Sequence, residues 1–97
     1  MTASSPPLEV TLYTRPGCHL CEDAKLVLLP LLHEFHAVLR EVNIDSDPHL
    51  TALYGYDIPV IFIGSRKAAK HRVDPAQFRR QLAEASAGLS KNKNGTT

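Results

Sequence analysis

The only two cysteines of this 97-residue chain stand three positions apart, in the segment Cys18-His19-Leu20-Cys21. Residues 8–13 before them alternate apolar and polar side chains, which predicts a strand, and a helical pattern of apolar residues begins at Cys18. Two thiols one turn apart can form a disulfide, and the N-terminus of a helix lowers the pKa of a thiol placed there. The fold must therefore contain a strand that leads directly into a helix whose first turn carries both cysteines.

The remainder of the chain continues to alternate strands and helices. We expect the first helix to reach about residue 29, bend at Pro30 and end with a turn to residue 35, because proline lacks an N–H. Asp47 and Asp74 are predicted N-caps, each followed by a proline at the first helical position. Further patterns predict strands over 37–44, 58–63 and 67–73, and helices over 48–54 and from 75 to a stop at Gly88. The order is β-α-β-α-β-β-α, which favours a mixed four-stranded sheet flanked by three helices.

Length and charge narrow the classes of protein to which the chain can belong. We expect one domain over residues 8–88, with a flexible leader at 1–7 and a flexible tail at 89–97. The formal net charge of +1 argues against a dedicated nucleic-acid binder. The longest apolar run, residues 26–32, is too short to span a bilayer. We therefore expect neither a nucleic-acid partner nor a membrane partner.

The N-terminal residues give a prediction of the cellular compartment. Residues 1–8 have neither the basic stretch nor the apolar core of a secretory signal. We expect a cytoplasmic protein, or a mitochondrial one if an Arg-rich leader precedes this chain.

Several segments resemble the glutaredoxins of the thioredoxin superfamily. They read LYTRPGCHLC, YGYDIPVIFI and HRVDPAQFRRQL, and the resemblance spans residues 8–86. It implies an α/β thioredoxin-like fold and a thiol–disulfide oxidoreductase of electron transport and cell redox homeostasis. It also implies glutathione as a co-substrate and no required metal or organic cofactor. In this family pattern Cys18 is the attacking cysteine, Cys21 the resolving one, and Pro59 a cis-proline that faces the disulfide.

The same resemblance assigns the binding residues. Arg15 stands where many glutaredoxins have a lysine that contacts a glutathione carboxylate. The backbone of Ile58 is expected to align a peptide or glutathione, and Asp74 occupies the acidic position that follows the family's Gly-Gly pair. The chain departs from the pattern at two pairs, with His19-Leu20 in place of Pro-Tyr and His71-Arg72 in place of the Gly-Gly that clamps glutathione.

The residues themselves give the chemistry. A thiolate is the nucleophile in disulfide exchange, and Cys18 at the helix N-terminus receives positive charge from the helix, from Arg15 and from protonated His19. Cys21 lies inside the helix and is better shielded, so it resolves the mixed disulfide that Cys18 forms. We expect a monomer that acts on disulfide-containing proteins or small-molecule disulfides. The basic residues between 66 and 80 form either a solvated face or a patch that attracts an anionic substrate.

Other interpretations of the two cysteines remain open. They could be inert core thiols, or zinc ligands, although structural zinc needs four ligands and His33 and His36 lie at the far end of the helix. A binding module of the thioredoxin fold could dock a peptide at Ile58-Pro59 without turnover. An iron–sulfur carrier could share a cluster between Cys18 thiolates and glutathione.

Overall fold

One mixed sheet organises the protein. The computed structural model describes the backbone of residues 8–94 and the side chains of residues 8–87. Its elements are β1 (Glu9–Thr14), α1 (His19–Glu34), β2 (Val38–Asn43), a 3₁₀ turn (Ile44–Ser46), α2 (Pro48–Tyr54), β3 (Val60–Ile63), β4 (Arg66–Lys70) and α3 (Pro75–Asn94). The strand order is β2-β1-β3-β4, with β1 parallel to β2 and antiparallel to β3, and β4 antiparallel at the edge. The predicted α/β thioredoxin-like fold is confirmed.

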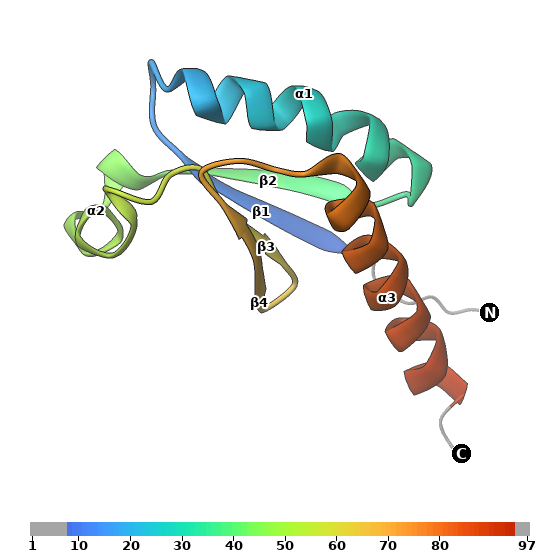
Figure 1. The fold of residues 1–97 in the computed structure, drawn as a ribbon. Coiled ribbons are helices and arrows are strands. Elements are labelled where there is room, and N and C mark those ends of the chain that lie inside the picture. The colour runs from blue at the N-terminus through green and yellow to red at the C-terminus, as the bar shows by residue number, and fades with distance from the viewer. Residues whose placement is uncertain (1–7, 95–97) are drawn as a thin grey trace.

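The core lies between one face of the sheet and helices α1 and α3 (Figure 1). Residues that alternate along β1 and β3 point to this face, as the pleat of a strand requires. They meet apolar side chains spaced one turn apart on α1 and on α3. The buried cluster consists of Val10, Leu12, Leu28, Leu32, Ile61, Ile63, Phe78 and Leu82.

Helix α2 lies at one end of the sheet (Figure 1). Tyr54 of α2 stacks on Tyr13, with 4.6 Å between ring centroids, and Phe62 meets Tyr13 edge-on at 5.7 Å. These aromatic contacts attach α2 to β1 and β3. They hold the connection from α2 to β3 close to the end of β1 that leads into the cysteine pair.

The predictions at one proline and one glycine need correction. Helix α1 ends at Glu34, close to the predicted residue 35, but it is one continuous helix through Pro30. Pro30 lies on the exposed side of α1, and Leu26 four residues earlier is 73% exposed, so water can satisfy the carbonyl that the proline leaves without a donor. Helix α3 likewise continues past Gly88 to Asn94, since a glycine within a helix costs only about 1 kcal/mol.

The strand boundaries differ from the predictions by one to three residues. β2 ends at Asn43, because the Asn43 side chain accepts the Asp45 N–H at 2.9 Å and starts the 3₁₀ turn. β4 ends at Lys70, because His71 has a left-handed φ of 69° that no strand residue adopts. The predicted caps of α2 are confirmed, with Asp47 accepting the His49 N–H and Pro48 at the first helical position. The leader at 1–7 lies outside the described residues, and so does the end of the tail at 95–97.

Candidate redox site at the N-terminus of the first helix

The turn between β1 and α1 brings the two cysteines together. Gly17 has a φ of 81°, a left-handed conformation that favours glycine, and the chain then enters α1 with Cys18 as the N-cap. Cys18 and Cys21 form a disulfide, with their Cα atoms 5.2 Å apart. The Cys21 N–H donates to Cys18 Sγ at 3.1 Å, and the Glu22 N–H donates to the Cys18 carbonyl at 3.2 Å. The sulfur at position 18 therefore occupies the place of an N-cap acceptor.

The two sulfur-bearing residues differ in burial. Cys18 is half-buried, whereas Cys21 is only 1% exposed and belongs to the buried side of α1. An incoming disulfide can reach the first residue and not the second. The geometry thus matches the predicted division into an attacking and a resolving cysteine, while the roles themselves are not tested by it.

A cis-proline lies at the same end of the sheet. The Ile58–Pro59 peptide bond is cis, as the resemblance implies, and Pro59 is buried. Tyr13 pairs with Val60 in the antiparallel β1–β3 register, so Pro59 falls beside Thr14, where β1 turns toward the cysteines. The Ile58 N–H donates to the Tyr54 carbonyl at 3.2 Å, so this backbone donor already has a partner within the protein.

His71 fastens the end of β4 to the cis-proline segment. Its N–H donates to the Pro59 carbonyl at 2.8 Å, and its Nε2 lies 3.2 Å from the Tyr56 carbonyl. The Asp57 carboxylate is 3.8 Å from the same ring. Where the resemblance leads one to expect a glycine, this chain thus keeps a left-handed backbone but adds a side chain that ties two loops together.

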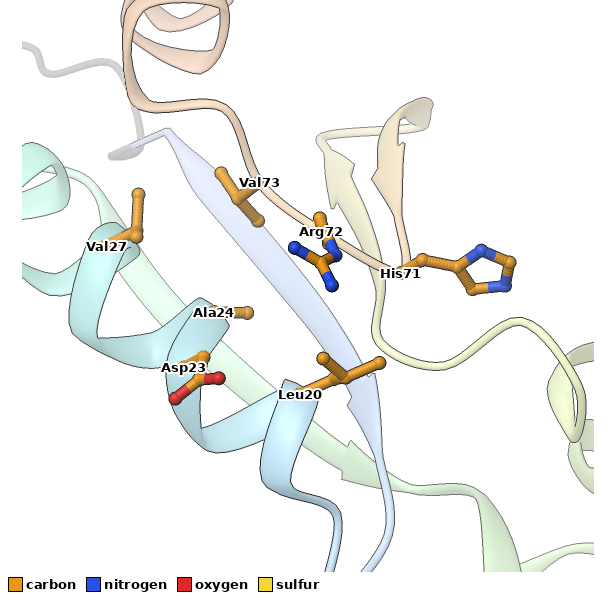
Figure 2. A pocket seen from close by; sticks show the side chains of 7 residues that line it. All are labelled: Leu20, Asp23, Ala24, Val27, His71, Arg72 and Val73. Atoms are coloured by element: carbon orange, nitrogen blue, oxygen red, sulfur yellow. The ribbon is translucent and has the colours of Figure 1, made fainter.

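A groove of about 200 Å³ is lined by Leu20, the residue that precedes Cys21 (Figure 2). One wall is the start of α1 and the other is the connection from β4 to α3. The groove is lined by Leu20, Asp23, Ala24, Val27, His71, Arg72 and Val73. The sequence predictions missed this groove, because its walls come from segments about fifty positions apart. The stretch of basic residues that includes Arg72 is the only signal that could have indicated it.

Two of the predicted binding residues have other partners. Arg15 donates through Nε and Nη2 to one Asp45 oxygen, at 3.1 and 2.9 Å. It lines a second pocket, shared with Glu22 and Glu41, and not the groove. Asp74 caps α3 by accepting the Gln77 N–H at 3.2 Å. Their glutathione-binding roles stay predictions.

His19 is the first residue of α1 and is exposed. It therefore lies next to Cys18 in the chain, and its predicted effect on the thiol stays a prediction. Within the described residues, no group of three His, Cys, Asp or Glu side chains is placed to hold a metal ion. None of the described helices is both long and apolar enough to cross a membrane.

Solved structures with low sequence identity to this chain show which fold it has. Thioredoxin 1 from the thermophilic eubacterium Thermosipho africanus superposes with a TM-score of 0.60 at 10% identity, covering 86% of this chain and 98% of that one. The fold is therefore that of thioredoxins. The model of the "Glutaredoxin-like domain (DUF836)" matches residues 9–83, and the chain belongs to this family.

Relatives at higher identity agree with the family assignment. The solution structure of protein Ne2328 from Nitrosomonas europaea has a TM-score of 0.69 at 31% identity, covering 84% of this chain and 99% of that one. A "Glutaredoxin-like protein YDR286C homolog" from Dictyostelium discoideum is 32% identical over 73 residues, which are 69% of this chain and 68% of that protein. The family thus shares a thioredoxin fold, and this member carries a Cys18–Cys21 pair at the start of its first helix.

Proposed function

We propose that this protein is a thiol–disulfide oxidoreductase that acts through Cys18 and Cys21. The observation that carries the proposal is the position of Cys18 Sγ, which takes the place of an N-cap oxygen and accepts the Cys21 N–H. A thiolate at this atom gains a hydrogen bond and the positive end of the helix dipole, whereas a neutral thiol gains much less. This difference lowers the pKa of the Cys18 thiol and increases its reactivity at neutral pH.

The reaction takes two exchange steps. In the first, the Cys18 thiolate attacks one sulfur of a substrate disulfide, that S–S bond breaks, and the departing sulfur leaves as a thiolate that takes up a proton. In the second, Cys21 loses its proton and attacks Cys18 Sγ, which releases the other substrate sulfur as a thiol. The substrate disulfide has then gained two electrons and two protons, and the protein holds the Cys18–Cys21 disulfide.

Regeneration needs an external thiol. Two molecules of a monothiol such as glutathione reduce the protein disulfide and leave as their own disulfide, so that atoms and electrons balance. The family resemblance supports glutathione in this role. The position of cis-Pro59 next to Thr14, where β1 turns toward the cysteines, supports an extended chain as the group that aligns beside Cys18.

The test is reduction of a protein disulfide by catalytic amounts of the purified protein. Dithiothreitol serves as the donor in one series, and glutathione with its reductase in the other. Turnover should disappear in Cys18→Ser and persist at a reduced rate in Cys21→Ser with glutathione, because a second glutathione can replace the resolving cysteine. Turnover that survives in Cys18→Ser would reject the proposal. Activity with dithiothreitol alone would reject only glutathione.

The same preparation distinguishes the two other functions that the sequence leaves open. A docking module would keep its partner in Cys18→Ser and show no turnover in the unmodified protein. An iron–sulfur carrier, purified without oxygen, would show visible absorbance.

A further inference from the structure

Arg72 places a guanidinium in the groove that Leu20 lines. Its side chain points from the β4–α3 connection toward Leu20 and Ala24 of α1 (Figure 2). Within the described residues it forms no side-chain hydrogen bond and no ion pair, in contrast to Arg15, which is held by Asp45. A cation in a concave site of mixed polar and apolar lining is available for an anionic group of a ligand.

The backbone that carries this guanidinium is fixed on both sides. The His71 N–H donates to the Pro59 carbonyl at 2.8 Å, and the Arg72 N–H donates to the Lys70 carbonyl at 2.8 Å. Val73, the next residue, packs against the buried core. The position of Arg72 relative to α1 is therefore set before any ligand arrives, which reduces the ordering cost of binding.

The groove also contains a residue from the segment that joins the two cysteines. Leu20, which forms its wall, stands between Cys18 and Cys21 and is 40% exposed. A chain whose cysteine forms a mixed disulfide with Cys18 thus extends its neighbouring residues past Leu20 toward Arg72. The apolar side chains on the α1 wall and the guanidinium opposite them match a segment that carries an apolar and an acidic residue.

One acidic residue shares the groove. Asp23 lines the α1 wall without an ion pair to Arg72. The Arg72 guanidinium thus has no ion-pair partner in Asp23. The negative charge of Asp23 also repels a ligand carboxylate that lies against the α1 wall. The favoured ligand therefore has a single acidic residue, located at the Arg72 wall.

We propose that Arg72 selects disulfide substrates in which an acidic residue lies next to the cysteine of an extended protein segment. This inference rests on the proposed oxidoreductase function and names its substrate class. It places anion recognition on the Arg72 side of α1. The Arg15 side, to which the family resemblance assigns the glutathione carboxylate, is engaged by Asp45.

Two synthetic peptides test the inference. Each carries Leu-Cys followed by either Glu or Gln, with the cysteine joined through a disulfide to a thiopyridine. Attack by Cys18 on the peptide sulfur transfers the peptide to the protein, and the released thiopyridine takes up the electron pair and a proton and is followed by absorbance. We expect the reduced protein to react about threefold to fivefold faster with the Glu peptide, the range for a partly exposed ion pair. This advantage should shrink with added salt.

Substitutions test whether Arg72 causes the faster reaction with the Glu peptide. Arg72→Gln should make the two rates equal, and Arg72→Lys should keep part of the difference. Arg66→Gln removes an exposed arginine that does not line the groove, and should leave the preference unchanged. Equal rates in the unmodified protein, or a preference that survives in Arg72→Gln, would overturn the inference.

The remaining outcomes separate this inference from the function on which it rests. If neither peptide reacts, the oxidoreductase proposal fails, and the substrate class fails with it. A third arm uses glutathione joined to the same thiopyridine. If Arg72→Gln slows only this arm and leaves the two peptide rates alike, the groove binds glutathione and the proposal of an acidic protein segment is wrong.

Discussion

The reactivity of Cys18 depends on a backbone donor that one substitution removes. The N–H of residue 21 donates to Cys18 Sγ at 3.1 Å. Cys21→Ser keeps this N–H and Cys21→Pro deletes it, while both leave Cys18 as the only thiol of the chain. Residue 21 is the third residue of α1, where an N–H has no carbonyl partner within the helix, so proline removes no helical hydrogen bond there.

The size of the effect follows from this contact. A hydrogen bond to a charged group contributes about 1.5–3 kcal/mol, and we take the lower end, about 1.5 kcal/mol, because Cys18 is only half-buried. That energy corresponds to a roughly tenfold change in the ratio of thiolate to thiol. Loss of the donor destabilises the thiolate and raises the pKa of Cys18. We expect the midpoint of the iodoacetamide alkylation profile to lie about one pH unit higher in Cys21→Pro than in Cys21→Ser, so that Cys21→Pro is alkylated more slowly at neutral pH.

The assay is the alkylation rate followed by mass spectrometry from acidic to alkaline pH, with circular dichroism to verify that both variants are folded. Cys18→Ser is the matched control. It leaves only Cys21, which is 1% exposed and should react slowly at every pH at which the fold persists. Equal titration midpoints in the serine and proline variants would refute the role of the N–H. A midpoint in Cys21→Ser at the ordinary value of a free thiol would refute activation altogether.

Other substitutions test the fold and the loops around the site. Phe78→Ala removes a core side chain that is 1% exposed and should lower the free energy of unfolding in urea by about 3–5 kcal/mol; a loss below about 1 kcal/mol would contradict the assigned core. Both His71→Ala and His71→Gly lose the contact to the Tyr56 carbonyl, but only glycine adopts the left-handed φ of 69° without strain. His71→Ala should therefore be less stable than His71→Gly by about 1 kcal/mol in thermal melts. The reverse order would show that the backbone at residue 71 is not strained. Asp45→Asn frees Arg15 from an exposed ion pair and should cost less than about 1 kcal/mol, while lowering the KM for glutathione if Arg15 binds its carboxylate; an unchanged KM would remove Arg15 from the glutathione site.

Features that depend on neighbouring residues could be predicted from the sequence. The caps at Asp47 and Asp74 are local, because each side chain bonds an N–H two or three positions further along the chain. The cysteine pair is local for the same reason, since its geometry follows once a helix begins at residue 19. The parallel pairing of β1 with β2 follows from the helix that joins them.

Boundary predictions are wrong where they depend on a single residue. Pro30 and Gly88 each predict an interrupted helix, but the helix packing around Leu28, Leu32 and Leu82 outweighs the local cost of a proline or a glycine within these helices. The early end of β4 could not be predicted, because histidine only infrequently adopts a left-handed φ.

The chemistry and the specificity of this protein therefore differ in how far they can be inferred from the sequence. Activation of Cys18 needs only the first turn of α1, which the segment from Gly17 to Glu22 builds by itself. Recognition needs Leu20 and Arg72 to face each other across a groove, and this depends on how the β4–α3 connection folds back over α1. If the proposed function holds, a change at His71-Arg72 would alter the groove without touching the N–H that donates to Cys18 Sγ, so substrate choice and sulfur reactivity could vary independently.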